Sequence, residues 1–546
     1  MRIVPLMTIA IMATFLSGCM VGPDYKAPDL ALPDEWSEPL EGGASANAPT
    51  FEEWWAVFGD ETLNSLVQRA ASGSYDLRVV EARLREVRTY EDIAGAALWP
   101  QVNAAAAYQH SQTQKIETPE ARKSSASVTL TPNGLAGVSI SSSPFGSAGP
   151  SFTSVPDLTG EGNSTLTIRS GSGVSTKMPD RQNDLYRAGF DATWELDVFG
   201  GIRREIEASR ADTQSVEELR RDVLVSVAAE VARNYFILRS SQNRLEIANK
   251  NIDAQTRSLD LARSRFERGL TSELDVKFAE AELASSKSVV PGLEASIQWA
   301  IHRLGVLIGS TPGALQEELA AKAPLAKTPP EVPVGLPVDI IRHRPDVRSA
   351  ERAIAAATAR IGVAKADLYP HFVLTGSLTG SSSTFDGITR GANTLWSFGP
   401  GIRWPVFDGG RIRANIRVQD ARQEQAIVAY EQTVMLALEE VENALVAYAK
   451  EQNRLVSLRE AVEANRRALE IAKQLYESGL VSFLNVIDAE RSLFANEDQL
   501  TQSETVVLTN LVALYKAIGG GWESFYPEQT EPVETSTAAG QTPAAQ

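Results

Sequence analysis

The sequence has few of the residues that most catalytic and metal sites use. It contains one cysteine in 546 residues, which excludes an intrachain disulfide framework. Basic residues are outnumbered, with 52 Lys and Arg against 69 Asp and Glu, so nucleic acid is a poor candidate partner. The histidines are scattered and stand in no metal-ligand or nucleophile motif: His110, His302, His343 and His371. We therefore expect neither an enzyme nor a metal or other cofactor.

Long apolar runs and aromatic residues are scarce as well. No stretch of about 20 apolar residues, the length of a membrane-spanning helix, occurs beyond the extreme N-terminus. Aromatic residues make up 7% of the chain. The long middle segments are dominated by Ala, Leu, Val, Glu, Arg and Gln, a composition typical of long helices. At this length we expect several modules or an extended shape.

The N-terminus has the pattern of a processed signal segment. An apolar stretch follows Arg2 and ends in Leu16-Ser17-Gly18-Cys19, which resembles a bacterial lipobox. The motif implies removal of residues 1–18 and acylation of Cys19 by several chains, palmitate among them, which anchor stably together. Met20, in place of Asp, implies routing to the outer membrane. An ordinary signal peptide with an incidental cysteine is the alternative.

The chain repeats itself. Gly269-Leu270 and the residues after it recur about 210 positions later at Gly479-Leu480. Without a gap, residues 230–309 match 440–519 at about 23 of 80 positions. Agreement over such a length predicts two copies of one structural unit.

The repeat also defines the domain boundaries. Upstream of the long helices the offset grows to about 270, so the first repeat carries an insertion of about 60 residues. After an acylated, extended segment over 19–58, we place the first repeat at 59–310 and the second at 331–518. The insertion, at about 111–184, is rich in Ser, Thr and Gly and is expected to be a long exposed loop. Residues 519–546 are expected to form a disordered tail.

One segment in each repeat alternates with a period of two residues. From Tyr186 to Val198 every second residue is apolar, and Arg187, Asp191 and Glu195 lie among the residues between. Such a pattern, with Trp and Tyr near the ends, is typical of a membrane barrel strand with lipid outside and water inside. A soluble sandwich edge is the alternative.

The second repeat has the same kind of strand, from Trp396 to Val406, and weaker partner strands are expected near 101–108 and 371–379. Each chain would then supply four strands. Four strands cannot close a barrel, and an open edge in lipid leaves backbone groups unpaired. We therefore expect a barrel shared between chains, with eight strands from two chains or twelve from three.

Long helices follow each strand pair. Helical patterns run without Pro or Gly from Ile202 to Arg268 and from Arg411 to Ser478, or about 100 Å each. Apolar residues recur three and four apart, which favours coiled-coil packing. Shorter helices are expected near Tyr75–Ala97 and Asp346–Ala366.

A turn ends each long helix. Gly269 and Gly479 are suited to stop a helix, and Ser272 and Ser482 to cap the next one. The returning helices are expected at about 273–308 and 483–517. Each repeat thus predicts a helical hairpin with its turn far from the membrane.

Together these features resemble the outer membrane factor family of TolC-like channels, in its lipoprotein branch of NodT and OprM type. The resemblance covers about residues 19–520 and rests on four segments: Cys19–Tyr25 with Trp36, Arg344–Arg348 with Ala350-Glu351, Trp404–Gly410, and Asp488–Leu493. It implies a homotrimer with a twelve-stranded barrel and a helical periplasmic tunnel, which is mainly α with a transmembrane β part. It further implies docking with a periplasmic adaptor (membrane fusion) protein and an inner-membrane pump of the resistance-nodulation-division class.

The resemblance also implies a periplasmic gate near the second turn. By position Leu484, Asp488 and Arg491 match it, and Asn485 stands where some relatives carry a second acid. Three copies of Asp488 around an axis would attract cations, and Asp–Arg bonds between helices would latch the constriction. The alternative is an ordinary helix-surface pair. Asp275 is a further gate candidate, with a capping-box acid as its alternative.

The predicted function is an exit duct for efflux, opened by the adaptor and the pump. Two other classes remain open: an outer-membrane component of peptide or protein secretion, and a coiled-coil structural lipoprotein without a channel. The exported substrate is not encoded in any motif of this chain.

Overall fold

The computed structural model describes most of the chain, with the following ranges: 20–29, 32–47, 52–112, 124–130, 137–142, 164–168, 182–326, 328–329, 331–390 and 394–526. Cys19 and the signal segment lie outside these residues. The chain divides into a helical unit and a β unit, the latter formed by Pro100–Trp194 and Leu374–Gly401.

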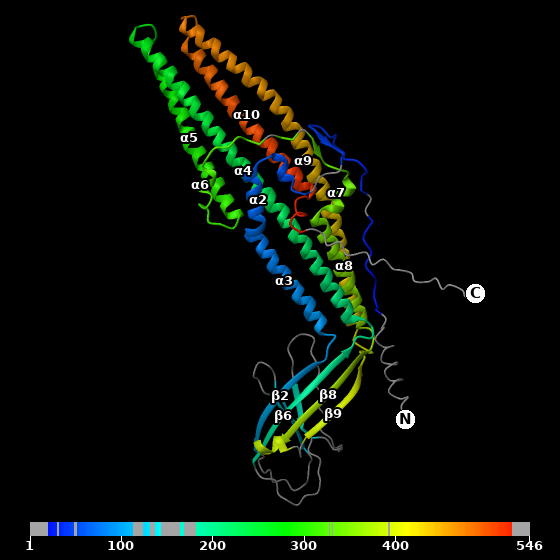
Figure 1. Ribbon diagram of the computed structural model, residues 1–546. Coiled ribbons are helices and arrows are strands. Elements are labelled where there is room, and N and C mark those ends of the chain that lie inside the picture. Colours follow the sequence, from blue (N-terminus) through cyan, green and yellow to red (C-terminus); the bar gives the residue numbers. More distant parts are fainter. Residues whose placement is uncertain are drawn as a thin grey trace, which may run out of the picture. The chain divides into compact units, whose positions relative to one another are not determined.

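Two long hairpins dominate the helical unit (Figure 1). The first joins α4 to α5 and the second joins α9 to α10. The predicted bounds are confirmed to within a residue: α4 Gly201–Glu267, α5 Glu273–Leu307, α9 Arg411–Glu477 and α10 Phe483–Ile518. Both α4 and α9 have 67 residues, about 100 Å of helix.

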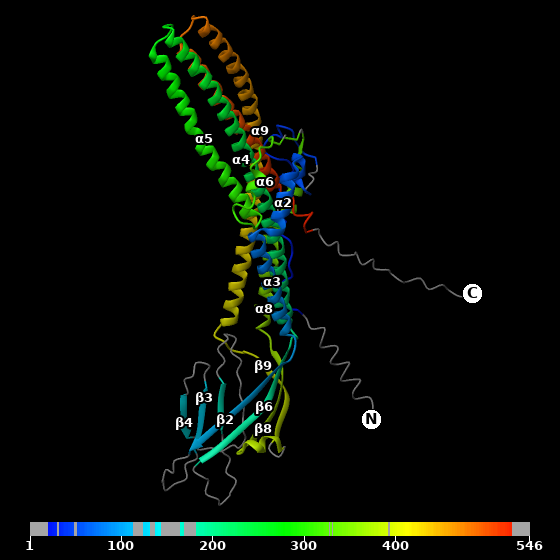
Figure 2. The ribbon, with the colours of Figure 1, turned by 60° about the vertical axis from the view of Figure 1, so that its left-hand side comes forward.

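The helices form one layer in which the helices of the first repeat lie beside those of the second (Figure 2). The shorter helices α3 (Tyr75–Ala96) and α8 (Pro345–Ala366) lie where they were predicted. Both α3 and α5 pack against α4, whereas α8 and α10 pack against α4 and α9. The order is therefore α3-α4-α8-α9 along one half of the layer and α5-α4-α10-α9 along the other. Helices α3, α5 and α9 form its edges.

The main core lies midway along the long helices. Trp54 and Trp55 of η1 (Trp54–Phe58) and the apolar face of α2 (Glu61–Gly73) pack against α4 and α10. Asp60 caps α2 by accepting from the backbone N–H groups of Thr62 and Leu63. Shorter elements complete the unit: α6 Gln316–Leu319, α7 Pro337–His343, and β1 Ala44–Ser45 paired in parallel with β7 Val332–Pro333. None of the helices in the described ranges is long and apolar enough to cross a membrane.

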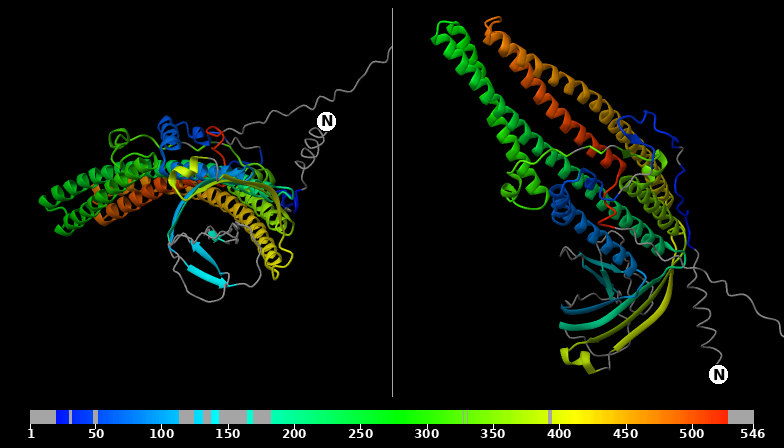
Figure 3. Two further views of the ribbon diagram at one scale, coloured as in Figure 1. Left: turned by 90° about the horizontal axis from the view of Figure 1, so that it is seen from below. Right: turned by 45° about the horizontal axis from the view of Figure 1, so that its top comes forward.

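The β unit contains a four-stranded sheet in the order β2-β6-β8-β9 (Figure 3). Its strands are β2 Gln101–Gln112, β6 Gln182–Leu196, β8 His371–Ser382 and β9 Thr394–Arg403. Strands β2 and β6 are antiparallel. The strand predicted as far as Val406 ends earlier because Pro405 has no N–H to donate, and the Trp404 indole donates instead to the Leu368 carbonyl at 3.0 Å.

The insertion contains regular structure, which corrects the expectation of a plain loop. Its strands form an antiparallel sheet in the order β4-β3-β5: β3 Ser124–Leu130, β4 Gly137–Ser142 and β5 Ser164–Ile168. These segments intersperse Val, Ile, Leu and Thr, which favour strands, among many serines. The low apolar content concealed that pattern.

The C-terminal prediction is also wrong over 519–526. Trp522 is 1% exposed and stacks on His343 with ring centroids 5.3 Å apart. Gly521 adopts a φ of 101°, and a Cβ there would meet the rings of Trp54 and Trp55. The buried Trp522 stabilises this short segment despite its glycines. Residues 527–546 lie outside the described ranges.

Candidate functional site

Glycine shapes both hairpin tips as predicted. Gly269 has a φ of 71° and Gly479 a φ of 72°, values that glycine adopts without steric penalty. After each glycine, the next N–H bonds back into the helix: Leu270 to the Arg265 carbonyl and Leu480 to the Leu475 carbonyl, both at 2.9 Å. The two turns therefore share one backbone design.

The side chains of the turns differ from the prediction and from each other. Ser272 and Ser482 stand at the N-cap positions, but neither hydroxyl makes a capping hydrogen bond. Ser482 Oγ donates instead to Asn485 Oδ1 at 2.8 Å. In the first turn the Thr271 hydroxyl donates to the Asp275 carboxylate. Asp275 therefore accepts a hydrogen bond from the Thr271 side chain and does not form the capping box considered as the alternative to a gate role.

An apolar cluster joins the two tips. Tyr476 and Phe483 of the second hairpin pack beside Leu259 and Val276 of the first. Arg265 of α4 reaches across, lying over the Tyr476 ring and donating to the Glu477 carbonyl at 3.0 Å. The hairpins of one chain are therefore held together near their ends.

The three predicted gate residues share one exposed face of α10. Leu484 is 47% exposed, and Asp488 is exposed as well. Arg491 does not pair with Asp488: its guanidinium donates to Glu282 of α5 at 2.5 Å. The helix-surface pair considered as an alternative is therefore wrong, and Asp488 has no ion-pair partner among the described residues.

Two further contacts near the tips escaped the sequence argument. The buried Glu490 accepts from Ser258 at 2.7 Å and pairs with Lys473 at 2.9 Å. In the first repeat, Arg263 and Glu280 pair at 2.9 Å and stand at the matching repeat positions. The recurrence of opposite charges at one offset was the signal in the sequence that could have revealed these pairs.

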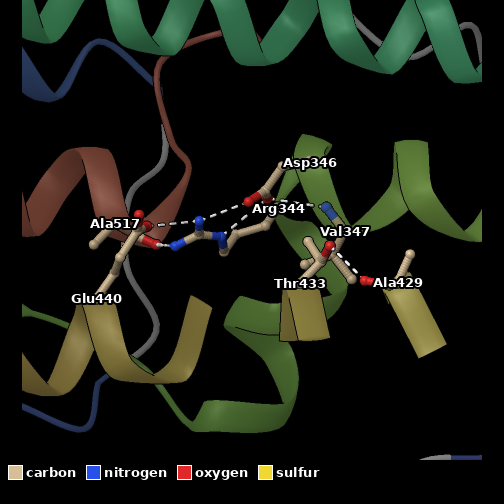
Figure 4. A network of polar contacts seen from close by, with 7 residues as sticks. All are labelled: Arg344, Asp346, Val347, Ala429, Thr433, Glu440 and Ala517. Carbon is tan, nitrogen blue, oxygen red and sulfur yellow. Dashed lines mark hydrogen bonds and ion pairs between the residues drawn. The ribbon is translucent and has the colours of Figure 1, made fainter. Parts of the chain in front are cut away.

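Arg344, in the segment that supported the resemblance, joins three helices (Figure 4). It is 6% exposed and donates to the Ala517 carbonyl at 2.6 Å, to Asp346 at 2.7 Å and to Glu440 at 2.8 Å. The Ala517 carbonyl belongs to the last turn of α10, where helical carbonyls lack intrahelical partners. Arg344 therefore fixes the end of α10 against α8 and α9.

The segment after Cys19 is fixed almost residue by residue. Val21 N–H donates to the Phe199 carbonyl at 3.1 Å. Gly22 has a φ of 107°, and a Cβ there would lie 2.5 Å from the Cα of Gly362. Beyond it, the almost fully buried Arg204 donates to Asp24 at 2.7 Å. The chain directly following the predicted lipid anchor is thus part of the folded helical unit.

Two helical hairpins joined near their tips and a four-stranded sheet with two outer strands are the architecture of an outer-membrane channel protein. The family model for outer membrane efflux proteins matches residues 153–310 and 336–520, which is more than half of the chain. The chain belongs to this family of outer membrane efflux proteins. It is an outer-membrane efflux channel that extends into the periplasm, in a family of transport ducts rather than of enzymes.

Individual relatives and solved structures agree with this assignment. Nodulation protein T of Rhizobium leguminosarum bv. viciae is 30% identical over 97% of this chain and 96% of its own length. The solvent efflux pump outer membrane protein SrpC of Pseudomonas putida is 32% identical over 64% of this chain and 76% of its own. The outer-membrane channel OprN superimposes with a TM-score of 0.75 at 34% identity, covering 92% of this chain and all of that one. The open state of the MtrE channel of Neisseria gonorrhoeae superimposes with a TM-score of 0.71 at 25% identity. The match covers 92% of this chain and 99% of that one.

Proposed function

We propose that three copies of this chain form the passive exit duct of a tripartite efflux system. A periplasmic adaptor protein and an inner-membrane pump of the resistance-nodulation-division class would open it, and acylated Cys19 would anchor each copy in the outer membrane. The observation that carries the proposal is that, among the described residues, both the four-stranded sheet and the helical layer end in edges without a neighbour.

The sheet ends at β2 and β9, which each have one neighbour in the four-stranded order. Within lipid, the unpaired N–H and C=O groups of an edge strand would be severely destabilising. Pairing β9 of one copy with β2 of the next removes all edges when the ring closes. Three copies supply twelve strands, enough to enclose a water-filled lumen.

The helical layer supports the same closure. Within one chain α4 has neighbours on both sides, whereas its repeat counterpart α9 has α8 and α10 on one side only. Helices α3 and α5 are the counterparts of α8 and α10, so those of an adjacent copy would pack on α9 in the same manner. Large apolar residues are exposed on these edges, including Trp299 of α5 at 70% and Val428 of α9 at 57%. A head-to-tail interface of this kind closes into a ring.

The names of the relatives support a duct that does not select its cargo. They name a solvent efflux pump, a toluene efflux pump and a cation efflux system, although all three are similar to this chain over 64% or more of its length. We therefore assign cargo selection to the pump and adaptor.

The interface is tested by Trp299→Asp in detergent-extracted protein, with native mass spectrometry and planar-bilayer recordings as readouts. We expect wild-type trimers that conduct, and loss of both trimer and conductance in the variant. Val57→Asp is the matched control, because Val57 is 46% exposed on η1, away from the edge helices. Conducting monomers, or trimers indifferent to Trp299→Asp, would overturn the proposed arrangement.

A further inference from the structure

A charged pocket of about 860 Å³ lies in the helical unit, away from the hairpin tips. Its walls come from α3, α4, α8 and the end of the folded C-terminal segment: Arg88, Gln214, Glu217, Glu218, Arg220, Arg221, Arg348, Glu351, Arg352, Phe525 and Tyr526. Five guanidinium groups face three carboxylates. A surplus of cations is unusual in a chain with a net charge of −17.

Each carboxylate of the pocket already has a partner. Glu217 pairs with Arg88 at 2.6 Å, and Glu351 pairs with Arg352 at 2.5 Å. One oxygen of Glu218 takes both Arg221, at 2.6 Å, and Arg348, at 3.1 Å. Each carboxylate of the lining therefore bonds to an arginine other than Arg220.

Arg220 differs from the other four arginines of the pocket, each of which pairs with a carboxylate. It has no carboxylate partner among the described residues, and its guanidinium lies 3.8 Å over the Tyr526 ring. Stacking on an aromatic face leaves the in-plane N–H groups of an arginine free to donate. Its Nε is buried without a hydrogen-bond partner, as are the Arg221 Nε and the second oxygen of Glu218, a side chain that is 9% exposed. Buried donors without partners are rare in folded proteins and mark a missing bonding group.

We propose that this pocket binds a small polyanion that carries carboxylate or phosphate groups, with Arg220 as the principal contact. A planar guanidinium matches the two oxygens of such a group in a bidentate fork. The volume is that of a ligand larger than a single phosphate ion, and Arg220, which has no carboxylate partner among the described residues, favours an anionic group. The anion has two possible sources, a free metabolite or the chain's own Glu528, Glu531 and Glu534, which follow Tyr526 in the sequence.

The test uses the full-length protein in detergent, with citrate and inorganic phosphate as separate probes in isothermal titration calorimetry at constant ionic strength. We expect saturable binding of one citrate per chain, weaker binding of phosphate, and at least a tenfold loss of citrate affinity in Arg220→Gln. Arg220→Lys should lose most of the affinity too, because an ammonium lacks the fork, whereas Tyr526→Phe should keep it. Arg467→Gln is the matched control, at an arginine that is 72% exposed on α9.

A full-length variant with Glu528→Gln, Glu531→Gln and Glu534→Gln distinguishes the two sources. Citrate binding several-fold tighter than in wild type identifies the chain's own carboxylates as competitors for the pocket, and unchanged binding identifies a free anion. Thermal unfolding in citrate provides a second readout, because a ligand that binds the folded state raises its melting temperature. Absence of saturable citrate binding in both wild type and this variant, or a folded Arg220→Gln that binds like wild type, would overturn the proposal.

Discussion

Arg491 of α10 donates to Glu282 of α5 at 2.5 Å and thereby joins the two repeats of one chain. Glu282 is 8% exposed, so the arginine neutralises a carboxylate that has little contact with water. The arginine assigned to the gate by sequence position is thus a link between hairpins, and Asp488 beside it faces outward.

Arg491→Ala should raise the conductance or open probability of the isolated channel. The substitution leaves Glu282 without its cation and loosens the contact between α5 and α10, which favours separation of the tips. Planar-bilayer recordings measure the effect, and the double variant with Asp488→Ala should open further. Arg467→Ala, which removes an exposed arginine of α9, should conduct like wild type. Unchanged conductance in correctly assembled Arg491→Ala trimers would remove this residue from the gate.

Asp488→Asn should lower the preference of the channel for cations. If three copies of this exposed carboxylate surround the axis, they set a negative potential at the narrowest point. The reversal potential in a salt gradient measures the preference, and we expect a shift toward zero with little change in thermal stability. Glu463→Gln, at a carboxylate that is 73% exposed on α9, is the control. A reversal potential equal to that of wild type would place the constriction elsewhere.

Asp222 should make the helical unit less stable as the pH rises. The pKa of Asp222 is raised from 3.8 to about 6, chiefly by burial and also by the nearby Asp346 and Glu440, while Arg344 and Lys516 oppose the shift. The folded chain therefore binds more protons than the unfolded chain between about pH 4 and 6. Stability is lost as the pH increases through that interval, by at most about 3 kcal/mol.

The measurement for Asp222 is the melting temperature of the assembled protein between pH 4 and 7. Asp222→Asn should weaken the decline with pH and raise the melting temperature above pH 6. Asp253→Asn, at an exposed position of the same helix, should retain the wild-type dependence. Parallel curves for wild type and Asp222→Asn would show that Asp222 ionises without penalty in the folded state.

Trp522→Ala should destabilise the protein strongly, although the tryptophan lies in a segment rich in glycine. Removing a fully buried tryptophan costs about 3–5 kcal/mol, and here it also removes the stack on His343 and the cation–π contact with Arg221, at 4.5 Å. Thermal unfolding of the trimer measures the loss, and Trp522→Phe should recover part of it. A melting temperature unchanged in Trp522→Ala would mean that residues 519–526 do not pack as described.

Local chemistry accounts for the parts of the fold that were predicted. The helix ends follow from Gly269 and Gly479, because few other residues adopt a positive φ at the end of a helix. The strands follow from period-two alternation, and the repeat follows from self-comparison. The prediction of a loop failed at β3 to β5, because the many serines of these segments concealed the strand-forming residues among them.

The sequence by itself determined the lengths of the helices, the positions of the turns and the presence of two copies of one unit, since these depend on neighbours within a few residues. Only the tertiary structure decided that Arg491 binds Glu282 rather than Asp488, that Trp522 is buried, and that Arg220 lies over Tyr526. Each of those contacts joins residues from elements far apart in the chain. Which residues meet depends on how the helices pack against one another, and a pattern within a few neighbouring residues contains no information on that packing.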